Sequence, residues 1–147
     1  MGKIDGLTLT PLKKHVDERG MLLHMMRNDS ESYKGFGEIY FSFTNPGVVK
    51  GWKKHTKMVQ NFAVPVGEIK LVVFDDREDS PSKGSVKEMM LSPDNYNLVT
   101  VPNNLWYSFK ATSNVPGMIA NCSTIPHDPE ETMGRPLEDE RIPYRWP

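Results

Sequence analysis

The sequence lacks several features that would indicate other classes of protein. Its single cysteine, Cys122, excludes an internal disulfide and a cysteine-rich metal site. No stretch of about 18 consecutive apolar residues occurs, and the N-terminus has no apolar run typical of a secretion signal. We therefore predict a cytoplasmic protein that does not bind a membrane.

The charged residues show no excess of one sign. Lysine and arginine total 18 against 19 acidic residues, which gives a net charge of −1. A nucleic-acid-binding domain normally carries a clear basic excess, so nucleic acid is not expected as a partner. Any anionic ligand must instead be bound by a local basic patch, which favours a small molecule.

Helical periodicity is nearly absent, and turn-forming residues are abundant. The chain of 147 residues contains 12 prolines and 11 glycines. Short β-type segments recur about every ten residues, with turn signals between them. The predicted strands are 7–12, 21–26, 38–43, 47–52, 60–66, 68–74, 86–92, 97–101, 105–111 and 118–123. This pattern predicts an all-β barrel or sandwich that forms one domain over residues 1–147.

The C-terminal segment, residues 126–147, has a different character, with five prolines and many charges. Such a composition is also found in disordered termini. However, Ile142, Tyr144 and Trp146 occupy alternate positions and would form one apolar edge. We therefore expect this segment to pack on the barrel.

A basic cluster lies just before two apolar strands, at Lys50, Lys53, Lys54, His55 and Lys57. Residues two apart on a strand face the same way, so Lys53 and His55 would point together into a barrel while Lys54 points outward. Tyr107, on a later predicted strand, would reach the same cavity. A solvated basic turn and an ordinary half-buried tyrosine are the alternative interpretations.

Six segments resemble, in order, the landmarks of the dTDP-4-dehydrorhamnose 3,5-epimerase family. They are "VDERG" (16–20), "GVVKGW" (47–52), "VFDDREDSPSKG" (73–84), "LSPDN" (91–95), "TVPNNLWYSF" (100–109) and "DERIPYRWP" (139–147). The resemblance implies a double-stranded β-helix, the cupin barrel, paired into a homodimer. It also implies an isomerase of deoxysugar and surface-polysaccharide biosynthesis, including that of lipopolysaccharide O-antigen. Its substrate would be a nucleotide-diphosphate 4-keto-6-deoxyhexose.

The sequence departs from this family at catalytic positions. Lys53 stands where the family has its catalytic histidine, and Tyr107 replaces a second histidine. His127 corresponds to the family's tyrosine, and Asp139 matches the aspartate that orients the catalytic base. The resemblance further implies that Lys50 and Arg19 take the places of phosphate-binding arginines.

The basic hairpin is also similar to that of the sugar-nucleotide 3,4-ketoisomerases. In "KGWKKHTKMVQNFAVPVG", His55 falls on the second histidine of their H-x-H motif and Gln60 falls on their glutamine. Three activities therefore stay open: an epimerase acting at C3 and in some cases C5, a 3,4-ketoisomerase, and an inactive sugar-nucleotide-binding cupin. We favour the epimerase.

The required chemistry assigns roles to these residues. Epimerisation beside a ketone needs a base, a group that stabilises the enolate, and an acid on the opposite face. A histidine is largely free to accept a proton near neutral pH, so we predict His55 as the base. Lys53 is predicted to stabilise the enolate, Tyr107 to donate a proton or bind the enolate oxygen, and Asp139 to fix the tautomer of His55.

The remaining predicted site residues bind substrate. Lys50 and Arg19 would hold the diphosphate, and Gln60 and His127 would contact the rest of the ligand. A cupin metal site needs several histidines and an acid, whereas the equivalent positions here offer His55 as the one ligand. No metal and no cofactor is therefore expected.

Overall fold

The computed structural model describes residues 3–147 and consists almost entirely of β-strands. Among those residues the one helical element is η1, a 3₁₀ turn at Pro129–Glu131. The strands are β1 (Thr8–Pro11), β2 (Lys14–Asp17), β3 (Gly20–Leu23), β4 (Glu38–Thr44), β5 (Val49–His55), β6 (Gln60–Val66), β7 (Ile69–Phe74), β8 (Val86–Leu91), β9 (Asn97–Val101), β10 (Trp106–Ala111), β11 (Gly117–Ser123) and β12 (Thr132–Gly134).

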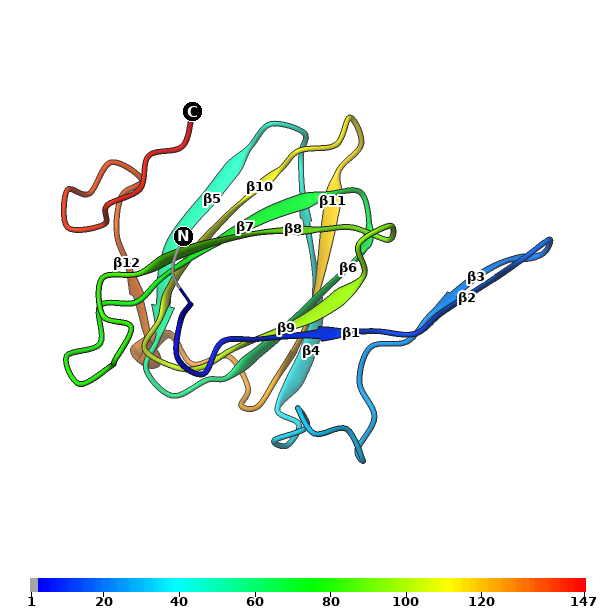
Figure 1. The fold of residues 1–147 in the computed structure, drawn as a ribbon, viewed down its shortest axis with the longest axis horizontal. Coiled ribbons are helices and arrows are strands. Elements are labelled where there is room, and N and C mark those ends of the chain that lie inside the picture. Colours follow the sequence, from blue (N-terminus) through cyan, green and yellow to red (C-terminus); the bar gives the residue numbers. More distant parts are fainter. Residues whose placement is uncertain (1–2) are drawn as a thin grey trace.

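Two five-stranded antiparallel sheets face each other and form a barrel-like jelly roll (Figure 1). One sheet has the order β1-β9-β6-β11-β4, and the other has the order β12-β5-β10-β7-β8. Apart from β7 and β8, all neighbouring strands in the two sheets are non-consecutive in the chain, as in a double-stranded β-helix. The predicted all-β cupin fold is therefore confirmed.

Apolar side chains from both sheets fill much of the space between them. They include Phe62, Val64, Leu71, Val73, Val99, Leu105 and Ile119, all of which are buried. A second cluster lies on the outer face of the β5-β10-β7 sheet. There Trp52, Val72, Phe74 and Trp106 are covered by Ile142, Tyr144 and Trp146 of the C-terminal segment. The alternating apolar residues of that segment thus pack on the sheet.

The predicted strands agree with the structure to within a few residues, with three exceptions. Strand β5 continues to His55, beyond the predicted end at residue 52. Strands β2 and β12 were not predicted, because each is short and consists mostly of exposed residues. β12 exists because it pairs with β5, with Thr132 opposite His55.

Strands β2 and β3 form a separate hairpin that projects away from the barrel (Figure 1). Its apolar side chains Val16, Met21 and Leu22 are more than half exposed. The outer face of the edge strand β4 also exposes apolar side chains, with Ile39 49%, Phe41 60% and Phe43 59% accessible. Two apolar surfaces, the hairpin and the β4 face, are therefore left uncovered by residues 3–147. No helix among residues 3–147 is long and apolar enough to span a membrane.

Candidate active site

A cavity of about 410 Å³ opens between the two sheets. Strands β5 and β10 form one wall, and β4 and β11 form the facing wall. The polar side chains that line it are Glu38, Tyr40, Ser42, Lys50, Lys53, His55, Tyr107, His127 and Thr132, and the apolar ones are Met58, Phe62, Phe109 and Ile119. Both sides of a bound ligand would therefore meet polar groups.

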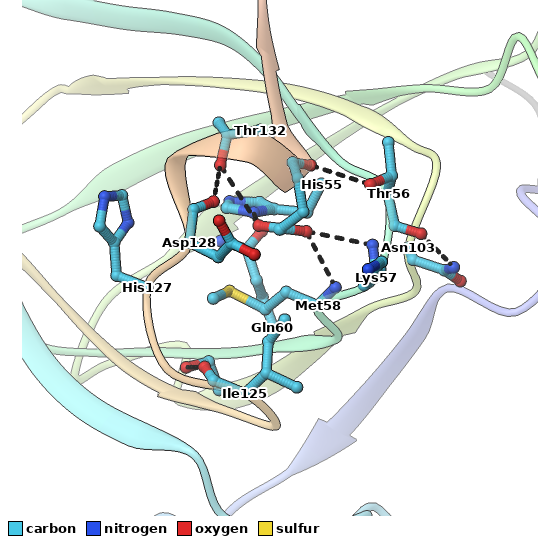
Figure 2. Close-up of polar contacts among 12 residues, drawn as sticks. His55, Thr56, Lys57, Met58, Gln60, Asn103, Ile125, His127, Asp128 and Thr132 are labelled. Carbon is cyan, nitrogen blue, oxygen red and sulfur yellow. Dashed lines mark hydrogen bonds and ion pairs between the residues drawn. The ribbon is translucent and has the colours of Figure 1, made fainter.

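His55 is the most constrained titratable group of this cavity. It ends strand β5, is buried, and its Nδ1 contacts the Oε1 of Glu131 in the turn η1. Figure 2 shows the surroundings of His55, with Thr56, Lys57 and Met58 following it in the chain. The pairing of β12 with β5 brings these two residues together although they are 76 positions apart in the chain.

The surroundings of Glu131 determine the tautomer of His55. Burial alone would raise the pKa of Glu131, but hydrogen bonds from His55 and from the backbone N–H groups of Lys57 and Met58 outweigh burial and lower it. Both N–H groups donate to Oε2 at 3.1 Å. An ionised carboxylate can only accept hydrogen bonds, so Nδ1 of His55 carries the proton. Nε2 is therefore left with the lone pair that a general base requires.

Tyr107 lies beside His55 on the same wall. Its ring is nearly parallel to the imidazole, at 10° and with 6.1 Å between the ring centroids. The Tyr107 hydroxyl is 3.4 Å from Nε2 of His55 and accepts a hydrogen bond from Nε2 of Gln60 at 3.2 Å. Burial raises the pKa of Tyr107 well above its ordinary value, so it remains a neutral phenol. Gln60 lies behind Tyr107 and orients it.

The two cations of the site lie on strand β5. Lys53 and Lys50 both line the cavity, whereas Lys54 points to the other face and pairs with Asp76 at 2.7 Å. The alternation predicted for residues 53–55 is therefore observed. Lys50 donates from Nζ to the carbonyl of Phe43 at 3.1 Å.

The C-terminal segment supports this strand through Ser108. The Ser108 hydroxyl donates to the carbonyl of Lys50 at 2.7 Å and accepts from Nε1 of Trp146 at 3.0 Å. A side chain at Gly51 would collide with Ser108, because an added Cβ would lie 2.6 Å from it. The close approach of β5 and β10 at this point therefore depends on Gly51.

The facing wall carries Tyr40 on β4 and His127 after β11. The hydroxyl of Tyr40 accepts a hydrogen bond from Nδ2 of Asn121 at 2.9 Å. Glu38 accepts a hydrogen bond from the backbone N–H of His127 at 3.0 Å, which fixes the chain at the cavity rim. In Figure 2 the His127 ring stands apart from His55 and makes no contact with it.

Asp139 does not orient His55, contrary to the sequence-based prediction. It accepts two side-chain hydrogen bonds from Arg141, at 2.9 and 2.6 Å, and caps a turn of the C-terminal segment. Glu131 occupies the position beside the imidazole instead. Sequence reasoning missed Glu131 because only the β5–β12 pairing, which was not predicted, places it near His55.

Arg19 does not line the cavity of its own chain. It lies in the turn of the projecting β2–β3 hairpin, its side chain is 84% exposed, and it pairs with Asp17 at 2.7 Å. The structure therefore brings together Lys50, Lys53, His55, Gln60, Tyr107 and His127, and leaves Arg19 and Asp139 elsewhere. Among residues 3–147 no group of three or more His, Cys, Asp and Glu side chains is arranged to hold a metal ion.

Comparison with known proteins identifies relatives over nearly the whole chain. The sequence profile of the family described as dTDP-4-dehydrorhamnose 3,5-epimerase matches residues 2–147. The probable low-salt glycan biosynthesis epimerase Agl13 of Haloferax volcanii is 33% identical over 146 residues, covering 98% of this chain and 90% of that protein. The spore coat polysaccharide biosynthesis protein SpsL of Bacillus subtilis is 30% identical over 145 residues, covering 97% and 96%.

A solved structure is similar over the same extent. The crystal structure of a dTDP sugar isomerase from Desulfovibrio desulfuricans superposes with a TM-score of 0.95 at 44% identity. The match covers 97% of this chain and 92% of that one. The similarity thus includes the barrel, the projecting hairpin and the C-terminal segment.

Proposed function

This chain belongs to the dTDP-4-dehydrorhamnose 3,5-epimerase family, and we propose that its cavity inverts a carbon beside the ketone of a nucleotide-diphosphate 4-keto-6-deoxyhexose. The observation that carries this proposal is the pair of His55 and Glu131. This pair leaves Nε2 of His55 unprotonated at a cavity that also contains a cation. A base and an adjacent positive charge are what enolate formation beside a ketone requires.

The proposed reaction uses His55 and Lys53 together. Nε2 of His55 takes the proton from the carbon next to the ketone, and the electron pair of the broken C–H bond becomes the enolate. The ammonium of Lys53 stabilises the oxygen as negative charge develops on it, a contribution typically worth about 100- to 1000-fold in rate. Tyr107, whose hydroxyl lies between Gln60 and Nε2 of His55, holds the imidazole in place.

Lys50 and His127 are proposed to bind substrate. Lys50 would bind the diphosphate through one compact ammonium group, because lysine lacks the planar guanidinium with which arginine holds two oxygens at once. His127 would contact the ligand at the rim of the cavity. We propose C3 as the carbon that is inverted, since Lys53 and His127 replace the family's catalytic histidine and tyrosine and a restricted reaction is expected.

Arg19 could contact the substrate only in the cavity of a second copy of the chain. It lies on a projecting hairpin with exposed apolar residues, and the β4 face is also apolar and uncovered. A homodimer in which each hairpin crosses to its partner would cover both surfaces and bring Arg19 to a diphosphate. We include this homodimer in the proposal, together with a cytoplasmic location and a role in the biosynthesis of a surface polysaccharide such as O-antigen.

Incubation with a panel of dTDP-4-keto-6-deoxyhexoses in heavy water tests the proposed activity. Proton NMR should show deuterium at C3 of a product that keeps its ketone at C4, and the His55→Ala variant should show neither exchange nor product. A 3-keto product would instead indicate the ketoisomerase alternative. Binding without exchange at any carbon would indicate an inactive sugar-nucleotide binder. The family model and the Haloferax volcanii relative are both named as epimerases, which supports the epimerase over the two alternatives.

A further inference from the structure

Inversion of a carbon needs a proton donor on the face opposite the base. His55, Tyr107 and Lys53 all belong to β5 and β10, which are paired strands of one sheet, with Tyr107 opposite Lys53. A proton returned from this wall would restore the original configuration. The acid that completes an epimerisation must therefore come from the facing wall of β4 and β11.

Tyr40 is the residue of the facing wall that is built for this role. It lies near the start of β4, and its side chain lines the same cavity as that of His55. Its exposed fraction is 39%, against 5% for Tyr107. The phenol of Tyr40 is therefore accessible to a ligand, whereas the phenol of Tyr107 is enclosed between Gln60 and His55.

The hydrogen bonding of Tyr40 leaves its proton free to be donated. Its oxygen accepts from Nδ2 of Asn121, which is fully buried on the adjacent strand β11. Oδ1 of Asn121 accepts from the backbone N–H of Asn61 at 3.2 Å, so the amide is fixed with its NH₂ group toward Tyr40. The same N–H donor would stabilise the phenolate that remains after proton transfer.

We propose that Tyr40 is the acid that protonates the enolate on the face opposite His55, an inference that rests on the epimerase function proposed above. In this step the O–H bond of Tyr40 breaks and a new C–H bond forms at the enolate carbon. The phenolate then regains a proton from solvent, and the imidazolium of His55 loses one. The cycle needs no oxidant, reductant or further reactant.

Three other polar residues of the facing wall fit this role less well. Ser42 offers only an aliphatic hydroxyl, and Glu38 already accepts a hydrogen bond from the backbone of His127. His127 itself lies on an exposed segment at the rim. His127 is therefore the rival that an experiment must distinguish from Tyr40.

The Tyr40→Phe variant separates proton removal from inversion. In heavy water, His55 should still exchange the substrate proton and return deuterium to the same face. We expect solvent exchange into the substrate within about threefold of the native rate, and formation of the inverted product to fall by about 100-fold or more. Mass spectrometry measures the exchange, and NMR of the recovered sugar nucleotide measures the inversion.

The other outcomes are also decisive. Inversion at the native rate in Tyr40→Phe, or an equal loss of exchange and inversion, overturns the assignment of Tyr40. Retained exchange with lost inversion in His127→Asn, but not in Tyr40→Phe, assigns the acid to His127. Absence of exchange in the native protein would instead contradict the epimerase function itself. Tyr96→Phe, which removes a hydroxyl outside the cavity, is the matched control, and unfolding temperatures verify that each variant is folded.

Discussion

The carboxylate of Glu131 holds Nδ1 of His55 and also accepts two backbone N–H groups from the turn that follows β5. One oxygen serves the imidazole and the other serves the backbone. This arrangement couples the conformation of the 57–58 turn to the tautomer of the proposed base.

Replacing Glu131 by glutamine should reverse the tautomer of His55. One side of the new amide must still face the N–H groups of Lys57 and Met58, so its oxygen will take that side and its NH₂ will donate to Nδ1. The proton of His55 then moves to Nε2, which can no longer accept one. We expect kcat for epimerisation to fall by about 100-fold or more. Glu130→Gln, at an exposed neighbouring position, is the control and should retain the native rate.

Asp139→Asn should change the rate by less than about threefold, because Asp139 contacts Arg141 and not His55. This variant distinguishes the observed geometry from the assignment that family resemblance implied. Steady-state rates of Asp139→Asn and Glu131→Gln, measured side by side, provide the comparison. A larger loss in Asp139→Asn than in Glu131→Gln would contradict the orienting role of Glu131.

Lys53→Met removes the positive charge beside the reacting centre and nearly preserves the length of the side chain. We expect kcat to fall by about 100-fold while KM changes little, since the charge acts mainly on the developing enolate. Lys53→Arg should recover part of the rate. Lys57→Met, which removes an exposed cation near the same turn, should leave both constants unchanged. A rise in KM with kcat unchanged would mean that Lys53 binds substrate in the ground state.

Mixing two inactive variants tests whether Arg19 acts in the site of a second chain. Arg19→Ala and His55→Ala should each abolish activity in separate preparations. When the two are co-expressed, a mixed dimer has one site that contains both native residues, so about a quarter of native activity should return. No recovery, or a monomer in light scattering, would show that Arg19 does not act across a dimer.

Asp75 should make the folded protein sensitive to acid. Burial would raise its pKa, but hydrogen bonds from Arg77, Ser80 and Ser82 outweigh burial and hold the pKa well below its ordinary 3.8. A depressed pKa stabilises the fold above about pH 4, and that contribution is lost as the pH falls toward the folded-state pKa. Denaturant unfolding followed between pH 2 and 7 tests this.

Asp75→Asn is the matching variant. It should lower the free energy of unfolding at pH 7 by about 1.5–3 kcal/mol, with the difference from native shrinking below about pH 4. Asp79→Asn, at an exposed position of the same loop, should unfold like the native chain at every pH. A constant difference between Asp75→Asn and native protein across this range would contradict the linkage.

Much of the fold could be predicted from the sequence, because short local patterns of residues indicate the strands and the turns between them. The two-residue alternation that places Lys53 and His55 on one face and Lys54 on the other depends only on strand geometry. Regularly spaced turn residues define most strand boundaries, because their effect on the backbone is also local. Strand β12 had no such signal. It has only three residues, and it is stabilised by pairing with β5 and not by a local sequence pattern.

The sequence by itself determined the fold class, the paired orientation of Lys53 and His55, and the family. Only the tertiary structure decided which carboxylate holds the imidazole, which tyrosine faces it across the cavity, and that Arg19 lies on a projecting hairpin. The physical reason is distance along the chain. Side-chain direction on a strand follows from neighbouring residues, whereas the contacts of Glu131 and Tyr40 depend on how strands far apart in the sequence pair and on which sheets then face each other.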